Sequence, residues 1–272
     1  MKGKLILLAS AVSAVAVVLG IDPGHFSYRQ VDVGGHRLRM LICGHGGPAV
    51  VFETGGSGAS GGPLEAWERV RPAVSRFTTT VAYDRAGIGL SAPGPRPRDA
   101  RQIACELHTA LSNAGVPPPY VLVGHSLGGP FIRVFAGLYP AEVAGMVLVD
   151  PTQEEFIAWN QARDPKQERR EDEEWKDIQA SLDEAHESRV PAGIPVTIIT
   201  AMGPRKLPPF VTEKERQELK LFRPMWLRFH NEWAAKVPNA KHVITENSGH
   251  VVPFEEPDLV VSAIRQTGGW IE

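Results

Sequence analysis

The chain has 272 residues, of which 43% are hydrophobic and 22% charged, a balance typical of a globular protein with one large core. Its 29 Lys and Arg residues stand against 31 Asp and Glu residues, so the formal net charge is -2 and no basic field exists to attract nucleic acid. We therefore do not expect nucleic acid to be a partner.

The N-terminal segment differs in composition from the rest of the chain. Lys2 and Lys4 precede an uncharged, largely apolar run over residues 5–21. This pattern predicts that residues 1–22 form a targeting segment, either a cleaved signal peptide or a membrane anchor. Because the positive end stays in the cytoplasm, we expect the domain to be exported and then secreted, periplasmic or anchored to the membrane by this segment.

From residue 26 onward, strand-like and helix-like segments alternate. Strands are expected at residues 28–33, 37–42, 49–54, 78–83, 120–123, 146–149, 195–200 and 242–245. Helices are expected at residues 64–74, 103–111, 126–138, 212–237 and 257–266. The alternation predicts a single α/β domain over residues 26–272, with a mostly parallel sheet covered by helices on both faces.

Residues 152–193 interrupt this alternation. The segment is rich in charge, and Trp175, Ile178 and Leu182 form one apolar stripe at helical spacing. It is therefore predicted to be a helical insertion between two strands.

The strand at 120–123 runs directly into a G-x-S-x-G sequence formed by Gly124, Ser126 and Gly128. A sharp turn from strand to helix places the serine in a strained backbone conformation, and glycine on both sides removes side chains that would clash there. The Ser126 hydroxyl is thereby expected at the carboxyl edge of the sheet. The N–H group of Leu127, at the start of the next helix, could then bind a developing oxyanion.

A serine nucleophile needs a base, and the chain has nine histidines. His250 follows a strand by a short turn, which places it on the same carboxyl edge as Ser126. We therefore predict His250 as the base, although a histidine in a surface loop would give the same pattern.

The chain resembles the α/β-hydrolase superfamily, and within it the serine esterase and lipase-like branch, from about residue 28 to the end. Besides the elbow at Ser126, AVVFETGGSG resembles the third strand and oxyanion loop, YDRAGIGLS the turn after the fourth strand, and SGHVVPFEEPDLV the histidine loop. The resemblance implies an eight-stranded sheet, a second oxyanion donor at the Gly56 N–H, and a helical cap at about residues 152–193. It also implies a small-molecule ester as substrate, cleaved through an acyl-enzyme intermediate.

The acid of the expected triad is missing from its usual place. In most of the family it follows the strand that is here expected at 195–200, but Pro204, Arg205 and Lys206 offer no carboxylate. A minority of related enzymes carry the acid one strand earlier, where this chain has Asp150. Asp150 is therefore the predicted acid, although an Asp before Pro151 is also a good helix cap.

Three other carboxylates are weaker candidates for the acid: Glu213, Glu246 and Asp84. Asp84 is expected instead to bind the amides of its own loop. Serine in place of aspartate at the elbow argues against the dehalogenase and epoxide-hydrolase branches.

Two alternatives to an esterase remain. A relative of the same fold could bind a ligand without catalysis. Gly56, Gly58 and Gly61, with Asp84 after the next strand, also resemble a dinucleotide-binding pattern. No metal-ligand motif and no nucleoside-triphosphate loop occur, so no metal is expected, and an esterase needs no cofactor. Cys43 and Cys105 could pair or remain two separate thiols.

Overall fold

A computed structural model describes residues 26–56, 64–155, 176–204, 213–238 and 240–270. The predicted targeting segment, and with it Gly58 and Gly61, lie outside these residues. Within the described ranges, no helix is both long and apolar enough to span a bilayer.

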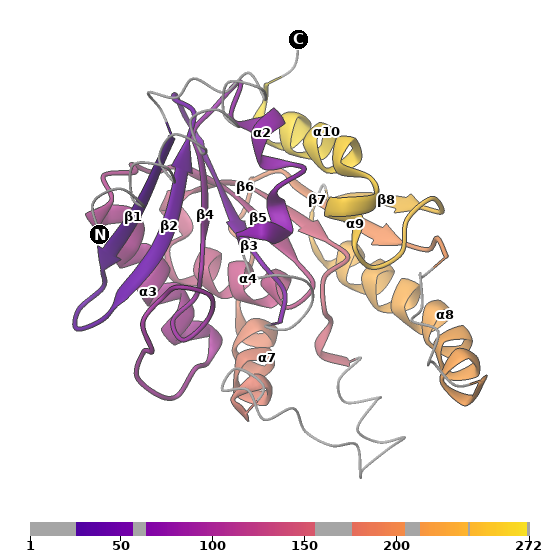
Figure 1. The fold of residues 1–272 in the computed structure, drawn as a ribbon. Coiled ribbons are helices and arrows are strands. Elements are labelled where there is room, and N and C mark those ends of the chain that lie inside the picture. The colour runs from indigo at the N-terminus through magenta and orange to yellow at the C-terminus, as the bar shows by residue number, and fades with distance from the viewer. Residues whose placement is uncertain (1–25, 57–63, 156–175, 205–212, 239, 271–272) are drawn as a thin grey trace, which may run out of the picture.

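Eight strands form one sheet, as Figure 1 shows. They are β1 (Phe26–Asp32), β2 (Arg37–Cys43), β3 (Ala49–Glu53), β4 (Thr80–Tyr83), β5 (Tyr120–His125), β6 (Val143–Val149), β7 (Val196–Ala201) and β8 (Lys241–Thr245). Their order across the sheet is β1-β2-β4-β3-β5-β6-β7-β8. Among the described strands, β1–β2 and β2–β4 pair antiparallel and the other pairs are parallel, so the expected mostly parallel sheet is confirmed. Strands β3 and β5 to β8 therefore end at one common edge.

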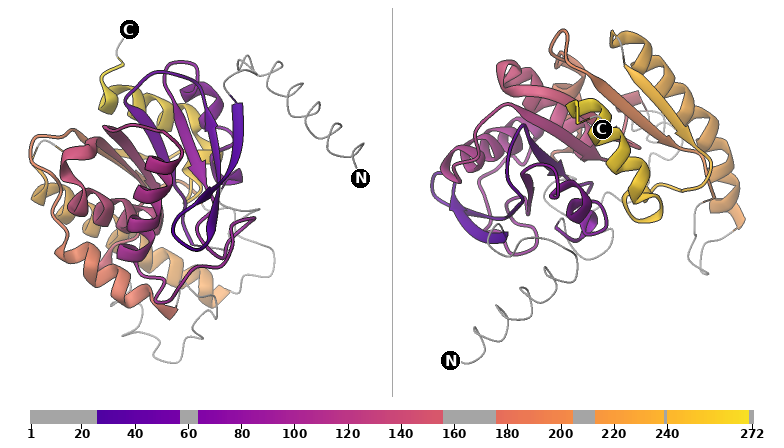
Figure 2. Two further views of the ribbon diagram at one scale, coloured as in Figure 1. Left: turned by 90° about the vertical axis from the view of Figure 1, so that its left-hand side faces the viewer. Right: turned by 90° about the horizontal axis from the view of Figure 1, so that it is seen from above.

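The described helices cover both faces of the sheet (Figure 2). They are α2 (Arg71–Val74), α3 (Ala100–Asn113), α4 (Gly128–Leu138), α7 (Ile178–Glu187), α8 (Glu213–Lys236), α9 (Val252–Glu255) and α10 (Pro257–Gly268). Helices α3, α4 and α7 pack on one face, whereas α2 and α10 pack on the other. The sheet is thus buried between two apolar layers, which holds its carboxyl edge rigid.

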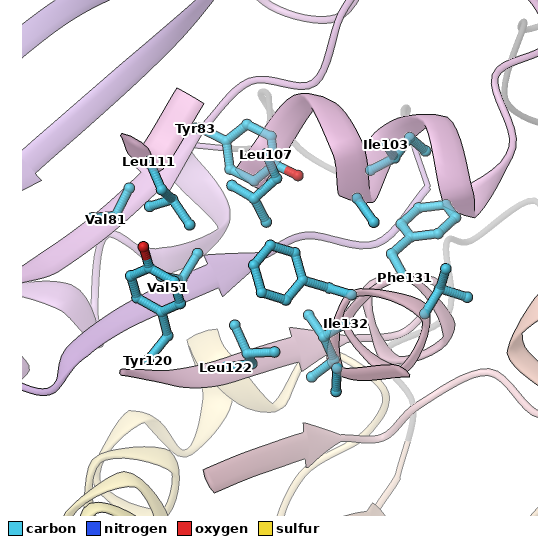
Figure 3. Packing of buried hydrophobic residues seen from close by; sticks show 14 of the residues in the cluster. Val51, Val81, Tyr83, Ile103, Leu107, Leu111, Tyr120, Leu122, Phe131 and Ile132 are labelled. Carbon is cyan, nitrogen blue, oxygen red and sulfur yellow. The ribbon is translucent and has the colours of Figure 1, made fainter. Parts of the chain in front are cut away.

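The larger layer lies where α3 and α4 meet the central strands (Figure 3). Leu107 of α3 and Phe131 of α4 are at most 2% exposed and face Val51 and Leu122 of the sheet. Burial of a side chain of this size stabilises the fold by about 1.5–3 kcal/mol. This packing holds α4, which begins two residues after Ser126.

One predicted helix is split in the structure. Residues 64–74 were expected to be one helix, but a short 3₁₀ turn at Glu65–Trp67 is followed by α2 at Arg71–Val74. Pro72 lies in the first turn of α2, where its missing N–H is harmless, whereas inside a continuous helix it would break a hydrogen bond. The predicted helix over residues 212–237 is α8, which is continuous through Pro224.

The predicted insertion is described in part. Its helix α7 packs against α3 and α4, whereas residues 156–175, with Trp175, lie outside the described part of the chain. Cys43 is buried, Cys105 is exposed, and both are free thiols.

Candidate active site

The turn between β5 and α4 holds Ser126 in a left-handed backbone conformation, with φ of 54°. This conformation costs a residue with a side chain about 1–2 kcal/mol and marks a constrained position. Both flanking positions require glycine, because a Cβ at either would clash with a backbone carbonyl. A Cβ at Gly124 would lie 2.4 Å from the carbonyl oxygen of Gly128, and one at Gly128 would lie 2.4 Å from that of Glu53. The sequence therefore folds here into the elbow that its glycines predict.

The His250 imidazole lies beside this serine. His250 Nε2 is 3.0 Å from Ser126 Oγ, within hydrogen-bond distance. The loop before His250 is held from two sides, because Gly249 N–H donates to the Glu255 carboxylate (2.7 Å) and Gly203 N–H donates to the Ser248 carbonyl (2.9 Å). An imidazole so placed can accept the serine proton.

Asp150 completes the arrangement from the end of β6. Its Oδ2 lies 2.6 Å from His250 Nδ1, and its side chain is fully buried. Burial by itself raises the pKa of the Asp150 carboxyl, but the hydrogen bond and charge of His250 and the N–H of Ala201 lower that pKa below its usual value. The carboxylate is therefore ionised and can fix the tautomer and orientation of the imidazole.

The neighbouring strand β7 ends without a carboxylate, but a backbone N–H at its end binds the Asp150 carboxylate. Ala201 N–H donates to Asp150 Oδ1 (3.0 Å), and Met202 N–H donates to the carbonyl of Thr245 at the end of β8 (2.7 Å). The loop after β7 thus anchors both the acid and the loop that leads to His250. Moving the acid by one strand, about 4.8 Å, keeps it within reach of the imidazole.

The loop after β3 lies against the serine. A Cβ at Gly55 would lie 2.9 Å from Ser126 Cβ, so only glycine fits there. Arg85 fixes this loop, since Nη1 donates to the Thr54 carbonyl (2.7 Å) and Nη2 to the Gly55 carbonyl (2.8 Å). The predicted oxyanion donor Gly56 follows at once. By binding both preceding carbonyls, Arg85 holds the backbone of this loop beside Ser126.

A buried polar cluster lies beneath that loop. The Glu53 carboxylate accepts from Arg85 Nη1 (2.5 Å) and from the Tyr83 hydroxyl. Burial and the Glu53 charge raise the pKa of Tyr83 well above its usual value, so this phenol stays a donor. Asp84 accepts from the Leu90 N–H (3.0 Å), which agrees with its expected role within its own loop.

Three further residues around the site were not predicted from the sequence. His125, beside the serine, has Nε2 2.7 Å from the carbonyl oxygen of His250. Trp226 and His230 lie on α8, and Trp226 Nε1 donates to Asp150 Oδ1 (2.7 Å). In the sequence, Trp226, Phe229 and Trp233 form an apolar stripe at helical spacing, which is typical of a helix packed on a sheet and gives no sign of the Asp150 contact. The signal that could have indicated His125 is its place directly before Ser126 in the G-x-S-x-G sequence.

The other carboxylates do not approach the imidazole in the described structure. Glu246 is exposed, Asp84 is engaged in its own loop, and the side chain of Glu213 lies outside what the structure describes. Among the described residues, no group of three or more His, Cys, Asp or Glu side chains could hold a metal ion.

Comparison with known proteins places the chain in a family. The family model described as alpha/beta hydrolase fold matches residues 41–214, which include both Ser126 and Asp150. The chain is 27% identical over 226 residues to the uncharacterized protein YqjL of Bacillus subtilis, covering 81% of this chain and 83% of that protein. It spans only 15–51% of the length of seven further curated relatives.

Solved structures share the fold at low sequence identity. A thermophilic esterase from Thermogutta terrifontis superposes with a TM-score of 0.57 at 18% identity, over 89% of this chain and 97% of that one. A serine hydrolase involved in carbazole degradation superposes with a TM-score of 0.60 at 17% identity, over 90% of this chain and 100% of that one.

The protein therefore belongs to the α/β-hydrolase superfamily, as the sequence motifs indicated. Its fold is shared with hydrolases of solved structure. The family match and the strand order favour the hydrolase fold over the dinucleotide-binding alternative.

Proposed function

We propose that the protein is a serine hydrolase that cleaves carboxylic esters through an acyl-enzyme intermediate. The observation that carries this proposal is one continuous chain of contacts, 3.0 Å from Ser126 Oγ to His250 Nε2 and 2.6 Å from His250 Nδ1 to Asp150 Oδ2. A partly buried serine, a base and a buried carboxylate in this order are what acyl transfer requires.

The reaction proceeds in two halves. Ser126 Oγ attacks the ester carbonyl while its proton passes to His250 Nε2, and the N–H groups of Leu127 and Gly56 bind the resulting oxyanion. The tetrahedral adduct collapses, the carbon–oxygen bond to the alcohol breaks, and the alkoxide takes the proton from His250. Water then repeats the sequence on the acyl-enzyme and releases the acid.

The ester assignment has support from the fold's neighbours as well as from the chemistry. One structural neighbour is an esterase and another is a serine hydrolase. Residues 152–193 lie between β6 and β7, directly after the acid, and we assign to them the cap that shapes the acyl and alcohol pockets. No cofactor or metal takes part in this scheme.

The proposal is tested by steady-state hydrolysis of p-nitrophenyl acetate, butyrate and octanoate by the full chain and by Ser126→Ala. The wild type is expected to release p-nitrophenol over many turnovers, and Ser126→Ala is expected to lose this activity by at least about 10³-fold. A single stoichiometric release, or none, from folded wild-type protein would instead identify a ligand-binding relative without turnover.

We further propose that residues 1–22 direct export, because two lysines precede an uncharged apolar run. Intact mass of the protein from membrane and soluble fractions of a bacterial host tests this directly. A full-length mass in the membrane fraction identifies an anchor, and a mass lacking the segment identifies a cleaved signal. Full-length protein found only in the cytoplasm would contradict export.

A further inference from the structure

Two side chains of α8, one helical turn apart, bind the turn that carries Asp150. Trp226 Nε1 donates to Asp150 Oδ1 at 2.7 Å, and His230 Nε2 lies 2.8 Å from the carbonyl oxygen of Pro151. Trp226 is 3% exposed and His230 is fully buried. Residues four apart on a helix lie on one face, so a single face of α8 engages both the carboxylate and the backbone that follows it.

The protonation of His230 follows from its partners. Burial lowers the pKa of His230 to about 4, so the ring is neutral near pH 7. Because Nε2 faces a carbonyl oxygen, it must carry the proton, and Nδ1 then accepts from the Thr200 hydroxyl at 2.6 Å. Thr200 Oγ1 in turn accepts from His242 Nε2, also at 2.6 Å. His230 is thereby fixed as a donor to Pro151.

The Asp150 turn needs such support for two reasons. Its φ of 43° is costly for a residue with a side chain, and it persists only where surrounding contacts determine it. The carboxylate also has two equivalent oxygens, and only Oδ2 faces His250. Two N–H groups, from Ala201 and Trp226, occupy Oδ1 and so leave Oδ2 to the imidazole.

We propose that Trp226 and His230 are positioning residues that hold the acid of the triad in its place at the end of β6. Trp226 orients the carboxylate, and His230 holds the left-handed backbone through Pro151. This inference rests on the proposed serine hydrolase function, and it assigns to α8 a role that neither the elbow motif nor the histidine loop supplies.

The test compares kcat and KM for p-nitrophenyl butyrate in the full-length wild type, Trp226→Phe and Trp233→Phe. Trp233 lies on the same helix but packs over Arg133, with 5.0 Å from its ring centre to the guanidinium carbon, so its variant controls for loss of an indole from α8. We expect kcat of Trp226→Phe to fall about 10- to 100-fold, the loss of one hydrogen bond to a charged group, with KM within about twofold. Trp233→Phe should keep the wild-type kcat.

Because Trp226→Phe also removes ring volume, a second variant carries 3-benzothienylalanine at position 226, which keeps the ring shape and replaces the N–H by sulfur. The same fall in kcat is expected. The proton NMR signal of the His250–Asp150 bond provides a readout that a merely structural role would not move: it should shift or broaden in both variants and stay unchanged in Trp233→Phe. Wild-type kcat and an unshifted signal in the benzothienyl variant would overturn the role of Trp226.

His230 is tested by a pair of substitutions. His230→Leu removes the donor to Pro151 and should lower kcat at least about tenfold, whereas His230→Gln keeps an N–H donor and should retain most of the activity. Equal kcat in the two variants would overturn the role of His230. A wild type that does not turn over esters at all would instead refute the proposed function, so the two failures are distinguishable.

Discussion

Ser126 and Asp150 adopt the same left-handed backbone conformation at the ends of the adjacent parallel strands β5 and β6. They are the two non-glycine residues with positive φ in the described part of the chain, at 54° and 43°. Their turns are joined by main-chain bonds, from Ser126 N–H to the Val149 carbonyl (3.2 Å) and from Thr152 N–H to the Ser126 carbonyl (3.0 Å). The turn of the proposed nucleophile and the turn of the proposed acid are therefore hydrogen-bonded directly to each other.

The position of the acid leads to the first prediction. Asp150→Asn should lower kcat/KM for p-nitrophenyl esters by about 10³- to 10⁴-fold, because the amide favours the wrong tautomer of His250 and cannot stabilise the imidazolium. Glu246→Gln, which neutralises an exposed carboxylate near the end of β8, is the matched control and should retain wild-type activity. If Glu246→Gln lost activity and Asp150→Asn did not, Asp150 would not be the acid of the triad.

The close approach of Gly55 to the serine gives the second prediction. Gly55→Ala places a Cβ 2.9 Å from Ser126 Cβ, so the oxyanion loop must shift away from the elbow. We expect kcat to fall at least about 10-fold, since misplacing an oxyanion donor removes transition-state stabilisation. Gly47→Ala is the control, because its nearest contact would be 3.9 Å away. Steady-state kinetics measure kcat of both variants. A wild-type kcat in Gly55→Ala would show that the loop tolerates the shift.

The buried guanidinium of Arg85 gives the third prediction. Arg85→Lys keeps the charge but cannot reach Glu53, Thr54 and Gly55 together, as the planar fork of arginine does. The free energy of unfolding should fall by about 3 kcal/mol, because buried partners lose their donors. Urea denaturation measures this loss, with the exposed Arg69→Lys as control. A loss of stability no larger than that of the control would show that Arg85 does not stabilise the loop after β3.

The buried histidines give the fourth prediction, which concerns pH. Burial lowers the pKa of His125 and of His230 to about 4, below the ordinary histidine value of 6.5. The unfolded chain therefore binds more protons than the folded one between these values, and the free energy of unfolding should fall as the pH drops from about 7 to about 4. Each histidine contributes up to about 3 kcal/mol to this fall.

Urea denaturation of wild type and His125→Gln at pH 8 and pH 5 measures this effect. At pH 8 both histidines are neutral in either state, so the difference between the proteins there reports the lost contacts alone. The loss of stability from pH 8 to pH 5 should be smaller in His125→Gln than in the wild type. An identical loss in both proteins would contradict the burial of a neutral His125.

The fold could be predicted from the sequence because its signals are local. Alternating apolar strands and amphipathic helices predicted the parallel sheet, and Gly124 and Gly128 predicted the elbow. The structure also brings Ser126, His250 and Asp150 together, since each follows a strand that ends at the same edge. Pro72 was the local signal that was missed, and it divides the helix predicted at 64–74.

The contacts around the site could not be predicted because they depend on tertiary packing. Trp226 lies 76 residues from Asp150 in the chain, and its apolar stripe is equally typical of a helix that only packs on a sheet. Only the rotation of α8 about its axis decides that the indole N–H meets the carboxylate. The contacts of Arg85 with the loop after β3 likewise depend on the pairing of β3 with β4.

The central claim, that Ser126 is an activated nucleophile, is tested most directly by intact-mass spectrometry of the full chain after reaction with a fluorophosphonate, beside Ser126→Ala. We expect one covalent adduct on the wild type and none on Ser126→Ala under the same conditions. A folded wild-type protein that stays unlabelled, or an adduct that persists in Ser126→Ala, would contradict the account.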